Sequence, residues 1–566
     1  MTRFRAMAGY TAPRGVDDDP PRCPLHRLPR LTALAVIVLA ASAHIGTNDT
    51  VYAGMAGPYP VRVTVRQPGV IPGLADITVR TEDRRVSRVL VTALQRLAQR
   101  GQAPPPDAAT PVPGEEGLFA AQLWLMVRGA HSVIVTIEGD AGRGSATIPI
   151  VAAANTVLPM SGTLLAIVAG GGLFLLIGLL TLIAAAARES VLAPGDAPAA
   201  ADRRRARFAV AFGAIVVALI LFGGWTWIRA ENEQYRQRID RPWNVAATMR
   251  ATIAGPVLDF AITDSLWVQR DNPQWLSRAG RYRRAEMIPD HGKMMHMFII
   301  GLPEMHAFAH VHPVRTGPND FTVRFPPLPA GRYRIYADIV HEDGTAHTLT
   351  ASVDATTQTP AMSPTAPAAS AAGDAAVRTA AATTSDSTAQ HGRTTYGTAG
   401  TVPDLDPDDG WWTGSAQTAA ASLDDGSTMQ WVNAAVPLVA GQDAELVIEV
   451  RAEDGSPAVL EPYMGMPAHA MLNRADGDVF VHIHPSGMIS MAAQQALDRA
   501  VAADTTTAGS AGFPMTHAPG DMLAPGASAG IVRFPFVAPS AGHYRLWVQI
   551  RRGGRVLTGA FDAVIR

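Results

Sequence analysis

Two long uncharged apolar stretches constrain this chain more than any other feature of its sequence. Residues 163–187 and 208–228 carry no charged side chain, and a helix of about 20 apolar residues is long enough to cross a bilayer. The segment between them contains five arginines, at positions 188, 203, 204, 205 and 207. Basic residues favour the cytoplasmic side of a membrane. We therefore expect transmembrane helices at 161–187 and 208–228, joined by a cytoplasmic loop at 188–207.

The N-terminal region predicts export of most of the chain. Residues 31–43 are apolar, follow several arginines and end in Ala-Ser-Ala, so residues 1–43 are expected to form a signal peptide or an N-terminal anchor. Cys23 is the only cysteine, which excludes an intrachain disulfide. One lysine among 47 basic residues, with abundant Ala, Gly and Pro, is typical of a GC-rich bacterial genome. The expected location is the bacterial cytoplasmic (inner) membrane, with most of the chain periplasmic or otherwise extracytoplasmic.

Composition limits the fold and the partners. A chain of 566 residues is too long for a single core. The formal charge of −2 is spread without a basic face, which argues against a nucleic-acid partner.

Short alternating runs separated by Gly, Pro and Asp predict a mainly β protein with three immunoglobulin-like or cupredoxin-like β-sandwich domains. We expect them at residues 44–160, 229–354 and 429–566, the last with an insertion at 491–528 that contains one helix. Residues 355–428 are poor in large apolar side chains, so we expect a disordered linker there.

The second and third expected domains look like copies. "HVHP" is followed by "FPPLPAGRYRIYADI" in one, and "HIHP" is followed after the insertion by "FPFVAPSAGHYRLWVQI" in the other. The shared AG-x-Y-R element predicts a tyrosine corner at Tyr333 and at Tyr544.

A histidine set can be placed on one face of a hairpin in the third domain. Asp476-Gly477 is a strong signal for a two-residue turn, and a turn at that point pairs His469 with His484. Because side chains alternate along a strand, His482 shares this face and lies diagonally across from His469. The three imidazoles are therefore expected to converge.

The second domain offers the same arrangement. A turn centred on Glu304 would pair His296 with His312, and His310 lies two residues before His312. Three imidazoles with an open position suit copper or zinc, and neighbouring thioethers favour copper. We therefore expect two metal sites whose candidate ligands are His296, His310, His312, His469, His482, His484, Met294 and Met466. His291, His306, His341 and His517 are weaker supporting candidates.

Other interpretations stay open. An H-x-H pair on a strand is also compatible with structural or pH-sensing histidines, and methionines commonly fill cores. The sequence lacks a Ser/His/Asp order, a phosphate-binding loop, an H-E-x-x-H motif and a zinc C-x-x-C motif, which favours a protein that is not an enzyme.

The segments "GKMMHMFII", "FAHVHP" and "LPAGRYRIYADI" resemble the YtkA-like family of exported β-sandwich proteins, over residues 290–354 and more weakly over 460–564. Residues 59–153, followed by a membrane helix, are loosely similar to YtkA-like and FixH-like proteins. The resemblance implies an exported β-sandwich associated with copper handling.

Together these features predict a membrane-anchored extracytoplasmic protein that binds copper for sequestration, sensing or delivery, with metal transporters or oxidase-assembly proteins as possible partners. The alternative is a scaffold without metal, which binds a partner protein in a membrane complex.

Overall fold

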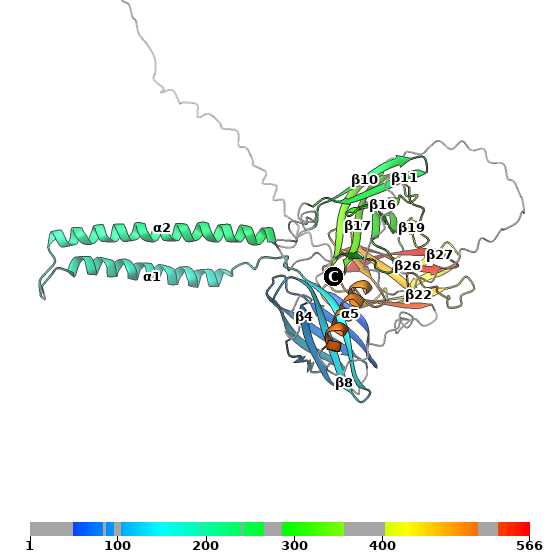
Figure 1. The fold of residues 1–566 in the computed structure, drawn as a ribbon, viewed down its shortest axis with the longest axis horizontal. Helices are drawn as coiled ribbons and strands as arrows, with labels where there is room; N and C mark the ends of the chain where they lie inside the picture. The colour runs from blue at the N-terminus through cyan, green and yellow to red at the C-terminus, as the bar shows by residue number, and fades with distance from the viewer. Residues whose placement is uncertain are drawn as a thin grey trace, which may run out of the picture. The chain divides into compact units, whose positions relative to one another are not determined.

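The computed structural model describes residues 49–82, 86–95, 104–193, 195–238, 242–264, 286–355, 402–507 and 530–566. The described part is mainly β and is built from several antiparallel sheets (Figure 1). The expected signal peptide at 1–43, most of the expected linker and much of the insertion lie outside the described residues.

Two helices separate the first β region from the rest of the chain. They are α1 (Gly162–Glu189) and α2 (Ala200–Arg238), both long and apolar enough to cross a membrane and both without burial inside the protein. The expected spans at 161–187 and 208–228 are shorter than these helices, because α2 begins at Ala200 and continues past the apolar stretch. Of the five arginines expected in the loop, Arg188 lies in the last turn of α1 and the other four lie on α2. Arg205 donates a hydrogen bond to the Ala187 carbonyl at the end of α1.

The first β unit, residues 50–152, has two sheets that share one apolar core. Its strands are β1 (Thr50–Ala56), β2 (Tyr59–Arg66), β3 (Gly73–Thr81), β4 (Val86–Gln95), β5 (Asp107–Ala108), β6 (Thr110–Pro111), β7 (Leu118–Leu125), β8 (Gly129–Gly139) and β9 (Gly142–Ala152). The sheet orders are β1-β2-β3-β7-β6 and β5-β4-β8-β9.

The second β unit, residues 245–355, also has two sheets around one core. Its strands are β10 (Val245–Thr252), β11 (Gly255–Ile262), β12 (Met287–Ile288), β13 (His296–Leu302), β14 (Ala307–Val311), β15 (Val314–Arg315), β16 (Asp320–Arg324), β17 (Gly331–His341) and β18 (Ala346–Ala355). One sheet has the order β10-β11-β16-β15. The other, called the β17 sheet, has the order β12-β17-β13-β14-β19, with β18 also paired to β17.

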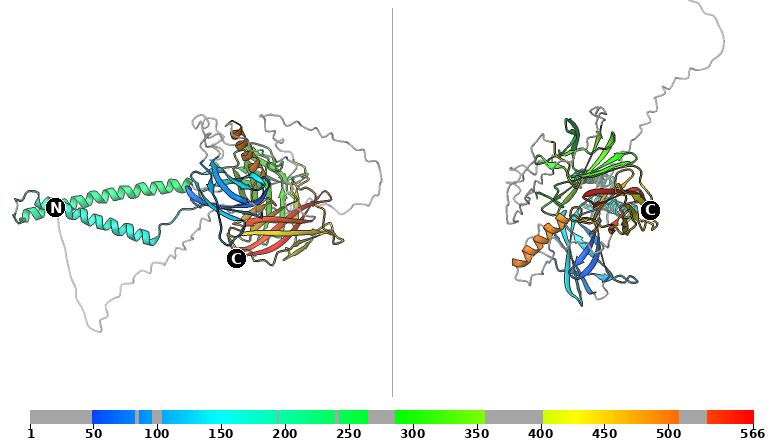
Figure 2. Two further views of the ribbon diagram at one scale, coloured as in Figure 1. Left: turned by 90° about the horizontal axis from the view of Figure 1, so that it is seen from below. Right: turned by 90° about the vertical axis from the view of Figure 1, so that its right-hand side faces the viewer.

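The third β unit, residues 420–565, repeats this plan. Its elements are β20 (Ala420–Ser422), β21 (Thr428–Trp431), β22 (Asp443–Arg451), β23 (Ala468–Arg474), β24 (Phe480–Ile483), α5 (Met491–Thr507), β25 (Ile531–Val537), β26 (Gly542–Arg552) and β27 (Arg555–Ile565). The sheets are β20-β21-β22-β25 and β24-β23-β26-β27, the second called the β26 sheet. α5 lies beside the first β unit (Figure 2), where Gln494 donates to the Thr147 carbonyl.

The expected linker needs a correction at its C-terminal end. Residues 402–428 are described, and β19 (Gly410–Thr413) pairs with β14 in the second unit. Backbone pairing with the edge of the β17 sheet orders this segment, and Trp412 packs against the apolar cluster that contains Phe308.

The hydrogen bonds of both predicted tyrosine corners are present in the structure. The Tyr333 hydroxyl donates to the Pro329 carbonyl and the Tyr544 hydroxyl donates to the Ser540 carbonyl, each four residues upstream. The two tyrosines are buried at the start of β17 and β26, so the two units share a fold-defining contact.

Candidate metal centre

The second and third units face one another through the outer faces of the β17 and β26 sheets. In β13, Met297 and Ile299 enter the core of the second unit, whereas Phe298 belongs to a different apolar cluster. In β23, Leu472 enters the core of the third unit and Met471 joins Phe298 in that second cluster. β13 and β23 are therefore buried on both faces, and strands of this kind have continuous apolar sequences. The histidines lie on the same outward-facing positions.

The two hairpins have the registers that the turns predict. In β13 and β14 the partners include Met297 with Val311, as a turn centred on Glu304 requires. In β23 and β24 the partners include Met471 with His482, as a turn at Asp476-Gly477 requires. His296 and His469 thus occupy equivalent positions, as do the pairs His310 with His482 and His312 with His484.

Contacts across the junction follow an approximate two-fold relation between the units. His296 pairs in register with Asp338 on β17, and His469 pairs with Gln549 on β26, so Asp338 and Gln549 are equivalent. Each serves the other unit: Asp338 accepts from His482 Nδ1 at 3.3 Å, and Gln549 Oε1 accepts from His310 Nδ1 at 3.0 Å.

The apolar part of the junction repeats the relation. Tyr336 stacks on Phe480 with ring centroids 4.3 Å apart, and its equivalent Trp547 stacks on Phe308 at 4.7 Å. Each unit therefore completes the other along the whole interface.

Seven imidazoles meet at this junction and form what we call the histidine cluster. Its members are His291, His296, His310, His312, His469, His482 and His484. Neighbouring rings lie close together, with centroids 5.1 Å apart for His296 and His312 and 5.0 Å apart for His469 and His484. Among the described residues, two groups of these imidazoles have potential ligand atoms that all lie within 4.8 Å of one another, and a third such group combines His312 with Asp406 and Asp409. The first triad is His296, His310 and His312, and the second triad is His291, His469 and His484. The sequence predicted two separate sites, but the structure brings them together.

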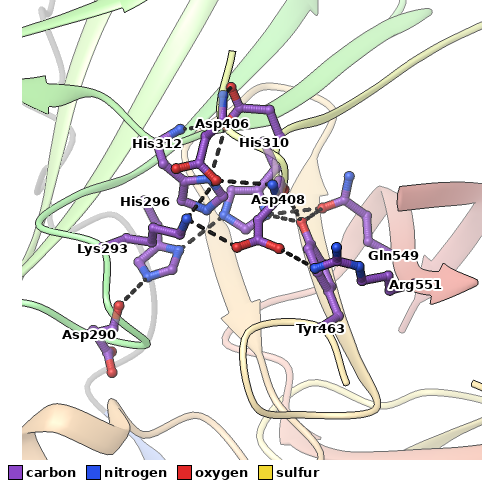
Figure 3. A network of polar contacts seen from close by, with 11 residues as sticks. Asp290, Lys293, His296, His310, His312, Asp406, Asp408, Tyr463, Gln549 and Arg551 are labelled. Atoms are coloured by element: carbon purple, nitrogen blue, oxygen red, sulfur yellow. Dashed lines mark hydrogen bonds and ion pairs between the residues drawn. The ribbon is translucent and has the colours of Figure 1, made fainter. Parts of the chain in front are cut away.

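The first triad contains an unusual hydrogen-bond arrangement. His296 Nε2 is 3.1 Å from the Asp290 carbonyl oxygen, and His310 Nδ1 is 3.0 Å from Gln549 Oε1. The Asp290 carbonyl can only accept, so His296 donates outward and turns an unprotonated Nδ1 inward. His310 Nδ1, by contrast, can either donate to Gln549 Oε1 or accept from the Tyr463 hydroxyl at 3.3 Å. These inward atoms, His296 Nδ1 and His310 Nε2, lie 3.1 Å apart (Figure 3). When His310 Nδ1 donates to Gln549, two lone pairs face each other at this distance and favour a cation between them; in the other tautomer, His310 Nε2 donates to His296 Nδ1.

The other rings of the cluster also have ring nitrogens without a hydrogen-bond partner among the described residues. His312 Nδ1 is held by Asp409 at 2.9 Å, and His484 Nδ1 by the Ile489 carbonyl at 3.1 Å. Buried atoms without a hydrogen-bond partner are Nε2 of His291, His312, His469, His482 and His484, together with Nδ1 of His469. Leaving a buried polar atom unpaired costs about 1–3 kcal/mol, so such a concentration indicates an absent partner.

Burial keeps most of these rings neutral. Burial lowers the pKa of His296 to about 4, and burial lowers the pKa of His310, His312, His469 and His484 well below the ordinary value. Burial also raises the pKa of Asp409 to about 7. Neutral imidazole is the form that binds metal ions.

His291 reaches the cluster from a tight turn that sequence reasoning underweighted. Asp290 and Lys293 exchange two backbone hydrogen bonds of 2.9 Å, and the central residues His291 and Gly292 both have positive φ. This is the geometry of a type I′ turn. The third unit repeats it at 463–466, with Met464 in the position of His291. The His-Gly dipeptide five residues before the first strand histidine was the available signal.

A charged network borders the first triad (Figure 3). Lys293, the only lysine in the chain, contacts Asp406 at 2.5 Å and Asp408 at 3.0 Å, and Asp408 also pairs with Arg551 at 2.8 Å. Together with Asp409, these acidic residues come from the segment expected to be linker. Sequence composition alone gave no signal for their position.

Among the sequence-predicted ligands, all six histidines join the cluster, whereas the methionines differ. Met294 packs against the apolar core of the second unit, which indicates a packing role. Met466 is buried in the 463–466 turn and stays a prediction. Among the supporting candidates, His306 is exposed, His341 lies against His347, and His517 lies outside the described residues.

Comparison with known proteins gives one family match. A family described as a domain of unknown function (DUF8832) matches residues 270–357 and 421–566. This match takes in strands of both histidine-bearing units and omits the first unit. No curated protein matches.

Similar solved structures include a tetra-tandem repeat from the extending region of a large adhesion protein, with 8% identity, a TM-score of 0.14 and coverage of 91% of this chain and 74% of the other. A putative membrane anchored protein from Corynebacterium diphtheriae has 7% identity, a TM-score of 0.13 and coverage of 91% and 95%. Latent PorU from Porphyromonas gingivalis has 8% identity and a TM-score of 0.12, and the chain covers 34% of its length. Scores this low carry no argument about fold or function.

Proposed function

We propose that this chain is a membrane-anchored protein that binds metal in the histidine cluster, for sequestration, sensing or delivery. Copper is the proposed metal, with zinc as the other ion that suits a site of imidazoles. Metal transporters or oxidase-assembly proteins would be its partners in delivery.

The inward nitrogens of His296 and His310 carry this proposal. Two nitrogens bound to one tetrahedral ion at 2.0–2.1 Å lie about 3.3 Å apart, close to the 3.1 Å between these two atoms. Their outer nitrogens are fixed by acceptors, which is the arrangement that orients a metal-binding imidazole. An additional proton shared by the two rings is disfavoured because burial lowers the pKa of both histidines. The metal-free alternative is the neutral tautomer in which His310 Nε2 donates to His296 Nδ1.

The choice of copper depends on the two methionines of the 463–466 turn. Met464 and Met466 are buried in the turn that precedes His469, and thioethers favour Cu(I) over zinc. We further infer that the three β units are immunoglobulin-like or cupredoxin-like sandwiches on the extracytoplasmic side of the bacterial cytoplasmic membrane.

Metal analysis of the full chain in detergent tests the function. Purified protein should retain stoichiometric copper after desalting, and a variant that disrupts both triads, with His310, His312, His469 and His484 all replaced by Ala, should lose it. His131→Gln is a matched control, because His131 is a buried histidine of the first unit with its own backbone partner. Metal-free protein with the same thermal unfolding as the variants would instead support the scaffold alternative.

Orientation needs a separate experiment. In a Cys23→Ser background, a cysteine at Ser415 should react with a membrane-impermeant maleimide on intact spheroplasts, whereas one at Ser190 should react only after lysis. The reverse pattern would overturn the proposed topology.

A further inference from the structure

We propose that the histidine cluster holds two metal ions, one in each triad, with His482 as a ligand that either ion can use. This proposal rests on the proposed function, because it specifies how that centre is filled. Its chemical class is a pair of neighbouring copper ions bound by imidazole nitrogen.

The number of donors favours two ions over one. A single tetrahedral ion takes four ligands, which would leave three of the seven imidazoles without a role. Those rings would keep buried nitrogens with no partner, as His469 now has on both sides of its ring. Two ions with three histidines each use six rings and leave only His482 to be placed.

The triads are adjacent but distinct. Within each, the potential ligand atoms lie within 4.8 Å of one another. Between triads, the rings of His291 and His296 have centroids 5.9 Å apart, and those of His310 and His469 are 6.2 Å apart. The first triad comes wholly from the second unit, whereas the second combines His291 of that unit with two histidines of the third unit.

His482 lies between the two groups. Its ring centroid is 4.4 Å from that of His484 and 5.6 Å from that of His469 in the second triad. It is also 5.8 Å from His296 and 5.9 Å from His310 in the first triad. Asp338 holds its Nδ1, and its Nε2 has no partner. We infer that this free nitrogen is the additional donor for either site, although His482 belongs to neither triad.

The surrounding carboxylates would stabilise two neighbouring metal cations. Asp409 contacts His312 at 2.9 Å, Asp338 contacts His482 at 3.3 Å, and Asp290 Oδ1 lies 3.7 Å from His291 Nε2. These acidic groups come from three different segments, so negative charge borders both triads and the histidine between them. Carboxylates hydrogen-bonded to ligating histidines raise ligand basicity.

Stoichiometry tests the proposal in the detergent-purified full chain. Titration with Cu(II), followed by desalting and metal analysis, should give two equivalents for the wild type and for His131→Gln. His312→Gln and His469→Gln should each give one equivalent. Electron paramagnetic resonance adds a readout of proximity: the second Cu(II) should produce a half-field transition in the wild type that is missing in both single variants.

The outcomes separate this inference from the function on which it rests. One equivalent in the wild type, abolished by either variant, would overturn the two-ion arrangement and leave metal binding intact. No retained copper in the wild type would overturn both. Two equivalents without magnetic interaction would contradict neighbouring sites.

Discussion

The second and third units place their histidines at equivalent positions but support them differently. In the second unit, His296 is held by a backbone carbonyl and His312 by the Asp409 carboxylate. In the third unit, the equivalent His469 has no hydrogen-bond partner, and His484 is held by the Ile489 carbonyl. The repeated fold therefore fixes where the rings lie, whereas segments outside the repeated strands decide how firmly each ring is oriented.

This difference predicts unequal triads. Pre-oriented ligands lose less conformational freedom when they bind, so the first triad should fill first and bind more tightly. The second triad depends on both units through His291, so it should be more sensitive to changes at their junction.

Among the predicted changes, acidification should have the largest effect on the free energy of unfolding of the metal-free protein. Burial lowers the folded-state pKa values of His291, His296, His310, His312, His469 and His484 below the ordinary value of 6.5, and that of His296 is about 4. The unfolded chain therefore takes up protons first as pH falls, so stability is full above about pH 6.5 and is lost toward pH 4. His296 alone should cost about 3 kcal/mol across this window, since one pKa unit corresponds to about 1.4 kcal/mol. Chemical unfolding of metal-free protein at pH 7.5 and pH 5 measures the part of this loss above pH 5, which is about 2 kcal/mol for His296.

Asp409 acts in the opposite direction, because its pKa is raised to about 7 and protonation then favours the folded state. The several histidines should outweigh this one carboxyl. Unchanged or increased stability at pH 5 would contradict the burial of neutral rings.

Leucine at the two equivalent strand positions should shift stability in opposite directions in the metal-free protein. His469→Leu removes two unpartnered buried nitrogens and should raise the free energy of unfolding by about 1–3 kcal/mol. His296→Leu leaves the buried Asp290 carbonyl without its imidazole donor and should lower it by about 1–3 kcal/mol. Urea unfolding in the presence of a chelator measures both.

The same two variants should both lose metal-dependent stabilisation. If His469→Leu destabilises the metal-free protein as much as His296→Leu, then His469 has a structural role and the asymmetry between the triads is wrong.

Replacing the carboxyl group of Asp409 should lower the copper affinity of the first triad and leave that of the second triad unchanged. Asp409→Asn keeps an acceptor for His312 Nδ1 but removes the carboxylate, and loss of such a supporting group typically lowers metal affinity about 10–100-fold. Competition with a chelator should show this loss for one copper equivalent, with the other unchanged. Asp338→Asn, which acts on His482, should by contrast affect both equivalents.

The hairpin geometry was predictable, but the meeting of the hairpins was not. The Asp476-Gly477 turn and the alternation of side chains predict that His469, His482 and His484 share a face, and the structure has that register. They do not reveal what covers the face. A signal was present in "HMFII" and "AHAMLN", which are apolar on both faces and therefore indicate a strand buried on both sides.

The supporting residues could not be found from local patterns. Asp409 follows a stretch whose composition predicts disorder, and it reaches His312 only because β19 pairs with β14. Gln549 supports His310 from 239 positions away along the chain. Contacts of this kind depend on how the units pack, which hydrophobic periodicity within one unit does not specify.

The smallest expected effect compares two equivalent arginines that cap the opposite unit's hairpin turn. Arg545 is buried, and donates to the Met305 carbonyl at 2.8 Å while pairing with Asp562. Arg334 is only partly buried and donates to the Asp476 carbonyl at 2.7 Å.

Hydrogen bonds to charged groups contribute about 1.5–3 kcal/mol when buried, and exposed ones contribute less. Arg545→Met should therefore lower the free energy of unfolding by about 2 kcal/mol, and Arg334→Met by under about 1 kcal/mol. Methionine preserves most of the aliphatic stem, so equal losses in urea unfolding would mean that the two ends of the junction are equally buried and that its asymmetry is confined to the histidines.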